Sequence, residues 1–218
     1  MRAFILGNSG ELLDHDLDKL KGEAVFGVNA LPIYKPDIIT HYVCADIGMA
    51  FVPEVRALVS KDCKKYYSRL MWNCIDHEDN VNVFDCYDDR LRSFEISTTK
   101  IYLCQTVTYA ALQIAAGLGY DEIYLLGIDL GLPANGIMHI PAQELLTTLI
   151  KEKNLHNPTV DKRFPNLGHE RLTKSMKHNF IIAKKVLDEN GIKVYNLSNG
   201  GNLNCFDRRN YEQVLGEK

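Results

Sequence analysis

The sequence predicts an α/β fold, a mostly parallel sheet with helices on both faces. Three observations lead to this prediction. Short apolar runs alternate along the chain with segments of helical periodicity. Several of these runs end in small or polar residues, as strands that end at a ligand-binding edge do. The 218 residues, 46% of them hydrophobic, are enough for one buried core, so we expect a single domain over residues 1–218.

Charge and hydropathy exclude several classes of protein. The 25 Lys and Arg residues against 28 Asp and Glu residues give a net charge of −3, and no long basic run occurs, which argues against nucleic acid as a partner. No stretch approaches the roughly 18 to 20 apolar residues of a membrane span, and the N-terminal apolar run is too short for a signal peptide. We therefore expect a cytoplasmic protein without a membrane span.

The six cysteines are scattered and form no C-x-x-C pair, and the histidines form no metal-binding pair such as H-x-H. We interpret the cysteines as reduced thiols, most of them in the core. The cysteines are Cys44, Cys63, Cys74, Cys86, Cys104 and Cys205. No metal site is predicted.

The first elements follow from short apolar runs. Residues 3–6 predict a buried strand, and residues 12–20 predict a helix after the turn at 7–10. Residues 24–29 and 38–45 predict the next two strands, each ending in a small or polar residue. A βα alternation of this kind is typical of parallel sheets.

The middle of the chain carries weaker signals. Pro53 is suited to the first turn of a helix that reaches residue 59. Short strands or sheet edges are expected at residues 65–72, 81–84 and 91–96. A well-buried helix is expected at residues 106–118, because its apolar residues have helical spacing and Gly119 can terminate it. Residues 122–129 give the clearest strand pattern in the chain.

Residues 130–168 form an insertion in which the pattern breaks down, and we interpret it as a lid over a site, with one possible helix at 143–151. The following helix, at 170–189, has one apolar face and a C-cap at Asn190-Gly191. A last strand at 192–197 and a short helix at 211–215 complete the prediction.

Polar residues follow four of the predicted strands. In an open α/β sheet such carboxyl ends meet at the edge where ligands bind. The residues concerned are Gly7, Asn8, Ser9 and Gly10 after the first strand, and Asn29, Asp46 and Asp129 after three others. The loop at 7–10 can hold a phosphate on its backbone N–H groups and on the N-terminus of the next helix. It can equally be a tight turn from strand to helix.

Two helix starts carry further candidate residues. Thr106 is a plausible N-cap, and with Thr108 and free backbone N–H groups it can hold an anionic group of a ligand. His169 precedes the long helix, where its imidazole can serve as a general base. The alternative is that His169 only caps that helix.

The motifs together resemble the 6-hydroxymethylpterin diphosphokinase-like family, which includes glycosyltransferase domains of motility-accessory proteins. The resemblance spans nearly the whole chain, although each motif is short. It is carried by GNSG at 7–10, FGVN at 26–29, YVCAD at 42–46, TVTYAA at 106–111, GYDEIYLLGID at 119–129 and NGIKVYNLSNGGNL at 190–203, with Phe206. The same order of motifs is similar to the bacterial sialyltransferases of glycosyltransferase family 42.

The similarity to those sialyltransferases implies a Rossmann-like fold, a cytidine-monophosphate sugar as donor and no metal. It implies that Asn8 and Asn29 contact the donor nucleotide and its phosphate, that Thr108 contacts the donor, and that Gly127 to Asp129 form the wall beside the nucleotide. His169 would match the base that takes the proton of the acceptor hydroxyl. Asp46 stands where those sialyltransferases have Asn, and the stretches around Gly131 and Ile137 lack their phosphate-binding tyrosines.

Three functions follow as expectations. The first is transfer of a sugar from a nucleotide-activated donor to a hydroxyl acceptor, with His169 as general base and no cofactor. The second is ATP-dependent transfer of diphosphate to a pterin alcohol, for which Mg²⁺ would be needed, with Asp46 and Asp129 as its ligands. The third is a nucleotide-binding module without catalysis. The sugar, the acceptor and the oligomeric state stay open at this point.

Overall fold

The computed structural model describes residues 1–76, 78–87, 92–131, 133–152 and 169–216, without the side chains of residue 151 and residues 169–172. Within this part of the chain nine strands form one sheet, and every neighbouring pair is parallel. The strands are β1 (Arg2–Leu6), β2 (Ala24–Val28), β3 (His41–Cys44), β4 (Lys64–Ser68), β5 (Val81–Cys86), β6 (Lys100–Ile101), β7 (Glu122–Leu126), β8 (Lys193–Asn196) and β9 (Asp207–Arg208).

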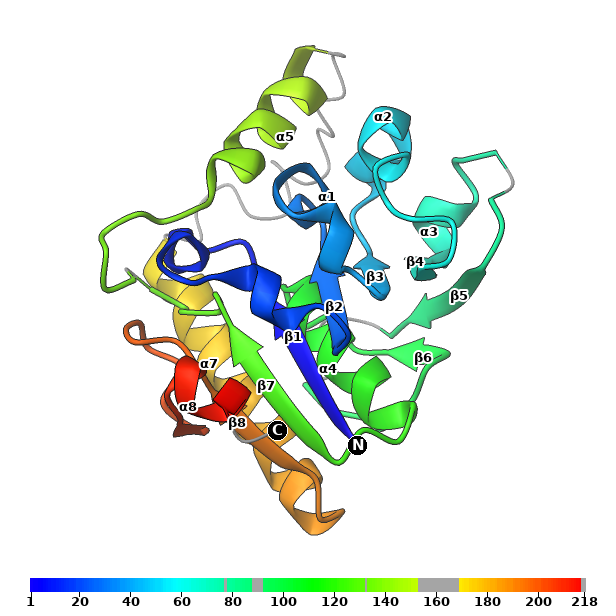
Figure 1. Ribbon diagram of the computed structural model, residues 1–218. Helices are drawn as coiled ribbons and strands as arrows, with labels where there is room; N and C mark the ends of the chain where they lie inside the picture. Colours follow the sequence, from blue (N-terminus) through cyan, green and yellow to red (C-terminus); the bar gives the residue numbers. More distant parts are fainter. Residues whose placement is uncertain (77, 88–91, 132, 153–168, 217–218) are drawn as a thin grey trace.

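Short and long helices connect these strands (Figure 1). The α-helices of the described residues are α1 (Leu31–Tyr34), α2 (Pro53–Arg56), α3 (Arg69–Trp72), α4 (Val107–Gly117), α5 (Pro141–Glu152), α7 (His169–Glu189) and α8 (Tyr211–Gly216). The 3-10 helices are η1 (Gly10–Asp14), η2 (Leu17–Leu20), η3 (Pro36–Ile38) and η4 (Ile47–Phe51). The expected helices at 106–118, 143–151, 170–189 and 211–215 thus correspond to α4, α5, α7 and α8 within two residues at each end.

The strand order is β6-β5-β4-β3-β2-β1-β7-β8-β9, so the chain builds the sheet outward from β1 in one direction and then in the other. The connection from β6 to β7 through α4 crosses back over the sheet to the free edge of β1 (Figure 1). The order therefore reverses between β1 and β7. In open α/β sheets this switch point is where the crevice at the carboxyl ends of the strands opens.

Both faces of the sheet are buried, as alternate residues of β1 show. Phe4 and Leu6 belong to a core that α1, η4 and α5 cover, whereas Ala3 and Ile5 belong to a second core under α4 and α7. Side chains of successive strand residues point to opposite faces, so a strand that is apolar throughout has to be covered on both sides. The chain thus has an α/β, Rossmann-like fold, as predicted.

Three predicted elements are wrong in type. Residues 12–20 form parts of η1 and η2 instead of one α-helix, because the side chains of Ser9 and Asp16 accept hydrogen bonds from the backbone two residues on and start a new turn each time. The strand expected at 65–72 ends at Ser68, whose hydroxyl caps α3. The described part of 91–96 pairs with no strand, because side chains of α4 bond to its backbone: Tyr109 to the Ser93 carbonyl and Gln113 to the Glu95 amide.

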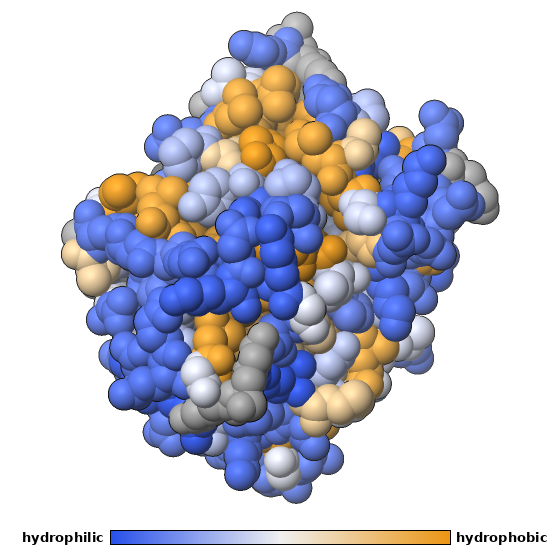
Figure 2. Space-filling model, in the orientation of Figure 1, coloured by the Kyte–Doolittle hydropathy of each residue, from blue (hydrophilic) through white to orange (hydrophobic). Residues whose placement is uncertain are grey.

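The described part of the expected lid consists of a loop and α5. Residues 153–168, the larger remainder of that prediction, lie outside the described residues. Figure 2 shows hydrophobic side chains gathered over α5 and over the loop that precedes it, where Leu145, Ile137 and Met138 are exposed. In the part of the chain that the structure describes, no helix is long and apolar enough to cross a bilayer.

All six cysteines are free thiols, in agreement with the prediction. Only Cys44, Cys63 and Cys104 are buried, and Cys74 and Cys86 are exposed, so the interpretation as core residues holds for half of them.

Candidate functional site

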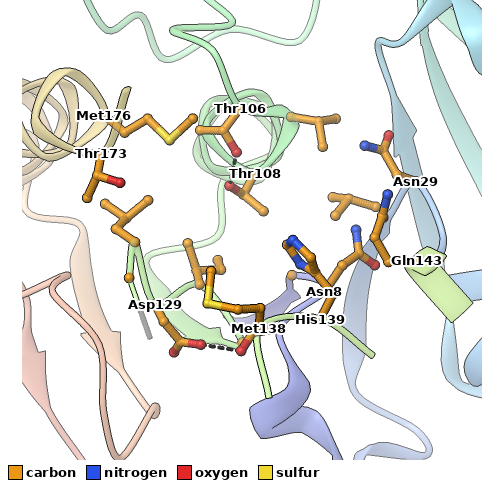
Figure 3. A pocket seen from close by; sticks show the side chains of 18 of the residues that line it. Asn8, Asn29, Thr106, Thr108, Asp129, Met138, His139, Gln143, Thr173 and Met176 are labelled. Carbon is orange, nitrogen blue, oxygen red and sulfur yellow. Dashed lines mark hydrogen bonds between the residues drawn. The ribbon is translucent and has the colours of Figure 1, made fainter. Parts of the chain in front are cut away.

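A cavity of about 550 Å³ opens at the switch point, where β1, β2 and β7 end (Figure 3). It is lined by Gly7, Asn8, Ser9, Val28, Asn29, Gln105, Thr106, Val107, Thr108, Gly127, Ile128, Asp129, Leu130, Gly131, Met138, His139, Gln143, Thr173 and Met176. A volume of this size fits a small organic molecule or a nucleotide. Eight of the residues expected at the site line it, namely Gly7, Asn8, Ser9, Asn29, Thr106, Thr108, Gly127 and Asp129.

The loop after β1 packs its backbone directly on the end of β7. A Cβ atom at Gly7 would overlap the carbonyl oxygen of Gly127, so only glycine permits this approach. The amide of Gly7 donates to the Leu126 carbonyl at 2.9 Å, and the amide of Ser9 donates to the Gly127 carbonyl at 3.3 Å. These N–H groups are therefore used inside the chain.

Gly10 does not line the cavity, in contrast to the expectation that it helps to hold a phosphate. Its amide donates to the carbonyl of Ile137 at 3.1 Å, and a Cβ atom at Gly10 would overlap that carbonyl oxygen. The helix expected behind this loop is the 3-10 turn η1, which has fewer aligned dipoles than an α-helix. The turn at Gly10 is thus the place where the segment around Ile137 packs on the loop after β1.

The N-terminus of α4 opens on the cavity instead. Thr106 occupies the N-cap position as predicted, but its side chain makes no capping bond. Its hydroxyl is hydrogen-bonded to that of Thr108, with the two oxygens 2.7 Å apart. The first amides of an α-helix have no acceptor within the helix, so the amides of Val107 and Thr108 are placed to meet a ligand. Both residues line the cavity.

Strained backbone gathers around the same cavity. Asn29, Gln105 and Leu130 line it with φ angles of 44°, 71° and 51°, and Cys104, next to Gln105, has a φ of 46°. Residues other than glycine seldom adopt this left-handed conformation, which costs on the order of 1 kcal/mol or more at each position. Such strain concentrates at binding and catalytic sites because packing elsewhere in the fold compensates for it.

The amide side chains of Asn8 and Asn29 face the cavity (Figure 3). The Oδ1 atom of Asn8 is buried and has no hydrogen-bond partner among the described residues. The carbonyl of Asn29 accepts from the Tyr42 hydroxyl at 2.8 Å, which holds this residue in its left-handed conformation. A buried acceptor without a partner is costly, so Asn8 is a group for which a ligand would supply the missing donor.

Asp129 lies at the floor of the cavity and is almost fully buried. One of its carboxylate oxygens accepts a hydrogen bond from the Ser9 hydroxyl, whereas Oδ1 has no partner among the described residues. Burial raises the pKa of Asp129 to about 6, and the neighbouring carboxylate of Glu11 acts in the same direction. Asp129 thus gains or loses a proton close to neutral pH.

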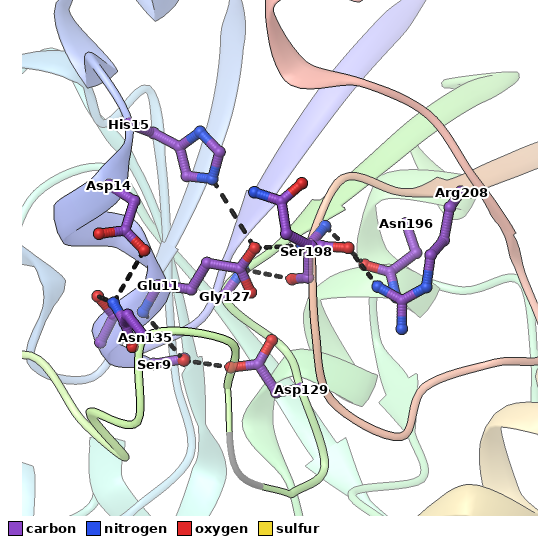
Figure 4. A network of polar contacts seen from close by, with 12 residues as sticks. Ser9, Glu11, Asp14, His15, Gly127, Asp129, Asn135, Asn196, Ser198 and Arg208 are labelled. Atoms are coloured by element: carbon purple, nitrogen blue, oxygen red, sulfur yellow. Dashed lines mark hydrogen bonds and ion pairs between the residues drawn. The ribbon is translucent and has the colours of Figure 1, made fainter.

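Glu11, which the sequence analysis did not single out, is fully buried beside Asp129 (Figure 4). Burial by itself would raise the pKa of Glu11, but hydrogen bonding with His15, with the backbone amide of Asn199 and with Asp129 outweighs it and lowers the pKa. The surroundings thus favour the ionised form of Glu11 and the neutral form of Asp129. The sequence alone does not indicate this pair, because a charged residue directly after a turn is expected to be exposed. Only the tertiary structure shows that Glu11 is buried.

The loop after β8 lies beside the network of Ser9, Glu11 and Asp129, with Ser198 and Arg208 next to Gly127 (Figure 4). The amide of Gly127 donates to the Ser198 hydroxyl at 3.2 Å, and the Arg208 side chain donates to the Ser198 carbonyl. The amide of Asn202 donates to the carbonyl of Asp129 at 2.5 Å. The glycine- and asparagine-rich motif at 196–203 therefore supports the floor of the cavity without lining it.

Two predicted site residues are placed differently. Asp46 is exposed and accepts a bond from the Gly48 amide at the start of η4, and it does not line the cavity. Asp46 does follow β3 at the same edge of the sheet, but it does not contribute to the binding site as expected, because the chain turns into η4 directly after β3. His169 is the first residue of α7, and its side chain lies outside what the structure describes. The next turns of α7 contribute Thr173 and Met176 to the cavity wall.

Comparison of the chain with protein-family models, with curated proteins and with solved structures gives no match. The arguments below therefore rest on the geometry of the site and on the motifs of the sequence.

Proposed function

We propose that this protein is a transferase that moves a sugar from a nucleotide-activated donor to a hydroxyl acceptor. The observation that carries the proposal is the cavity at the switch point, which combines the N-terminus of α4 with Asn8 and Asn29. Helix N-termini bind phosphate groups, and the carboxyl edge of such sheets is where nucleotides bind. The resemblance to family 42 sialyltransferases assigns donor contacts to Asn8, Asn29 and Thr108, all of which line this cavity.

In this mechanism the donor phosphate lies against the amides of Val107 and Thr108, and Asn8 and Asn29 hold the nucleoside part. His169 takes the proton of the acceptor hydroxyl, whose oxygen forms a bond to the anomeric carbon. The bond between that carbon and the phosphate oxygen breaks, and its electron pair leaves with the phosphate. Thr173 and Met176 line the cavity and His169 begins the helix that carries them, which supports the choice of His169 as the base.

The diphosphokinase alternative has less support in this geometry. It requires cations that neutralise a triphosphate, with Asp46 and Asp129 as ligands of Mg²⁺. Only Asp129 lines the cavity, and one of its oxygens is engaged by Ser9, while Asp46 caps η4. Among the described residues no group of three or more potential ligands could hold a metal ion. The carboxylates that this function needs are thus not brought together.

Binding of a panel of nucleotides tests the proposal at its first step. Thermal stabilisation would be measured with CMP, CDP, UDP, GDP and ATP, each with Mg²⁺ and with EDTA. A ligand at about 100 times its Kd adds roughly 2.7 kcal/mol to the free energy of unfolding. We expect stabilisation by a cytidine or uridine nucleotide in EDTA. Stabilisation by ATP with Mg²⁺ alone would favour the diphosphokinase instead, and no stabilisation by any nucleotide would contradict both.

Replacement of the proposed base tests the catalytic step. His169→Ala is expected to reduce the transfer rate by roughly 10² to 10⁴ while the affinity for the nucleotide stays within about twofold. His178→Ala, at an exposed position of the same helix, is the matched control and should transfer at the normal rate. Normal turnover by His169→Ala would remove His169 from the mechanism, and nucleotide binding without any turnover in the wild type would favour the non-catalytic binding module.

A further inference from the structure

We propose that His139 contacts the phosphate of the donor and stabilises it as it leaves. The inference rests on the proposed function, since it assigns one more residue to the same cavity. His139 lines the cavity next to Asn8 (Figure 3). The sequence analysis left this residue without a role, because it lies in the loop between β7 and α5 where no periodic pattern predicts its position.

Backbone hydrogen bonds fasten the chain on both sides of His139. On one side, the Gly10 amide donates to the carbonyl of Ile137 at 3.1 Å. On the other, the amide of Ile140 donates to the carbonyl of Asn8 at 3.0 Å, and Ile140 is fully buried. The two anchors are only three residues apart, so the backbone at His139 is held against the loop that follows β1. This loop in turn packs on β7.

Asn135 reinforces the same attachment. Its side-chain nitrogen donates to the carbonyl of Gly10 at 2.9 Å and to the carboxylate of Asp14 at 2.9 Å. Its side-chain oxygen accepts from the amide of Ile137 at 3.0 Å. These attachments give the backbone that carries the imidazole a defined place beside the cavity, as a phosphate-binding residue needs.

The charges of the cavity favour this role for His139. It is the only basic side chain among the described residues that line the cavity, and Asp129 is the only acidic one. The amides at the start of α4 provide partial positive charge, but no described lysine or arginine lines the cavity to share a phosphate's charge with them. Among the described residues, His139 is thus the one lining side chain that can place a ring N–H with positive charge against a phosphate in this cavity.

The role is defined by the step that it assists. When the bond from the anomeric carbon to the phosphate oxygen breaks, the electron pair stays on that oxygen and the phosphate gains negative charge. An imidazolium N–H that donates to this oxygen is favoured more strongly after the bond breaks than before it. The proton of the acceptor hydroxyl goes to the general base, so His139 does not have to exchange a proton for the reaction to balance.

The test separates the phosphate from the rest of the nucleotide. Affinities for cytidine and CMP, and for uridine and UMP, would be measured by calorimetry in EDTA for the wild type, His139→Ala and His139→Lys. His178→Ala serves as the matched control, because it also removes an exposed histidine. The readout is the ratio of the affinity for the monophosphate to that for its nucleoside.

We expect the wild type and His178→Ala to prefer the monophosphate. His139→Ala should lower this preference roughly tenfold or more, with the nucleoside affinity unchanged, and His139→Lys should restore most of it. An unchanged preference in His139→Ala, or an equal loss of nucleoside and monophosphate, would overturn the role of His139. Equal binding of both by the wild type would overturn this inference but leave a nucleoside site, whereas no binding of either would overturn the proposed function as well.

Discussion

The two ends of the parallel sheet bury titratable groups in opposite ways. At the amino end, His41 begins β3 and its ring stacks on Phe26, with centroids 4.3 Å apart, beside Tyr66 and Tyr120. At the carboxyl end, Asp129 lies among polar groups in the network with Ser9 and Glu11. Both side chains are about 5% exposed or less. Burial lowers the pKa of His41 and raises that of Asp129, so each favours its neutral form.

The surroundings decide which of the two groups is available for function. His41 is enclosed by aromatic rings, and its Nε2 atom is buried without a partner in the described structure, so it is a core residue that happens to be titratable. Asp129 lines a cavity, and its proton is coupled to a second carboxyl group. A shifted pKa therefore indicates a functional site only where the group can also reach a ligand.

The largest expected effect is a loss of stability at the carboxyl end of the sheet, where the backbones of Gly7 and Gly127 are in close contact. Gly7→Ala would push a Cβ atom into the carbonyl of Gly127 and weaken the bond from its own amide to Leu126, so we expect a loss of more than about 3 kcal/mol in the free energy of unfolding. Denaturant unfolding measures this loss. Gly216→Ala, at an exposed helix end with open space around it, should be nearly neutral. Equal stability of the two variants would mean that the loop after β1 can move away from β7.

The next largest expected effect is the pH dependence of stability that His41 causes at the amino end of the sheet. The pKa of His41 is lowered to about 4 by burial and, second, by the charge of Lys64. The folded state resists protonation, so stability is present above about pH 6.5 and is lost as the pH falls towards 4. The loss should be about 2 to 3 kcal/mol between pH 7.5 and pH 4.5. His41→Phe should remove this part of the dependence, as measured by urea unfolding at both pH values.

A matched histidine makes the test specific. His178→Ala, at an exposed position on α7, should keep the full pH dependence of the wild type. If His41→Phe loses as much stability on acidification as the wild type does, other groups are responsible, and the aromatic surroundings of His41 do not keep it neutral.

The smallest expected effect is a pH dependence of stability with the opposite sign, which Asp129 causes at the carboxyl end of the sheet. Because the pKa of Asp129 is raised to about 6, its contribution to stability is present below about pH 3.8 and is lost as the pH rises through 6. Between pH 4.5 and pH 7.5, the free energy of unfolding of Asp129→Asn should therefore rise by about 2 kcal/mol relative to that of the wild type. The lowered pKa of Glu11 opposes part of this gain. Asp62→Asn, an exposed control, should show no such change. Titration of the Asp129 carboxyl carbon near pH 4 in an NMR experiment would contradict the raised pKa that burial and Glu11 give this group.

The fold could be predicted largely because the strands are buried on both faces. Runs such as residues 3–6 and 123–126 are apolar without interruption, and a parallel sheet covered by helices on both faces buries them. The prediction of a strand at 91–96 failed because side chains, and not a neighbouring strand, bond to the backbone there. Gln113 and Tyr109 bond to the backbone of residues 93–95, and no local sequence pattern in that segment indicates a partner on α4.

The candidate site could be predicted in part because strand ends meet at one edge. Asn8, Asn29 and Asp129 follow neighbouring strands of the sheet, so the topology alone brings them to one cavity. His139 and Glu11 could not be found in this way. Their positions depend on single contacts between distant segments, such as the bond from Ile140 to Asn8 and that from Asn199 to Glu11. Such contacts leave no periodic signal in the sequence.

The central position of β1 also bears on how the chain assembles. One edge of β1 pairs with β2, which follows within a few turns of chain, but its other edge pairs with β7, Arg2 with Glu122. During synthesis that second edge has to wait until more than half of the protein has been made, and an uncovered edge of an apolar strand invites pairing with other chains. The strand order that opens the cavity thus also makes β1 the place where a nascent chain is most exposed to misassembly.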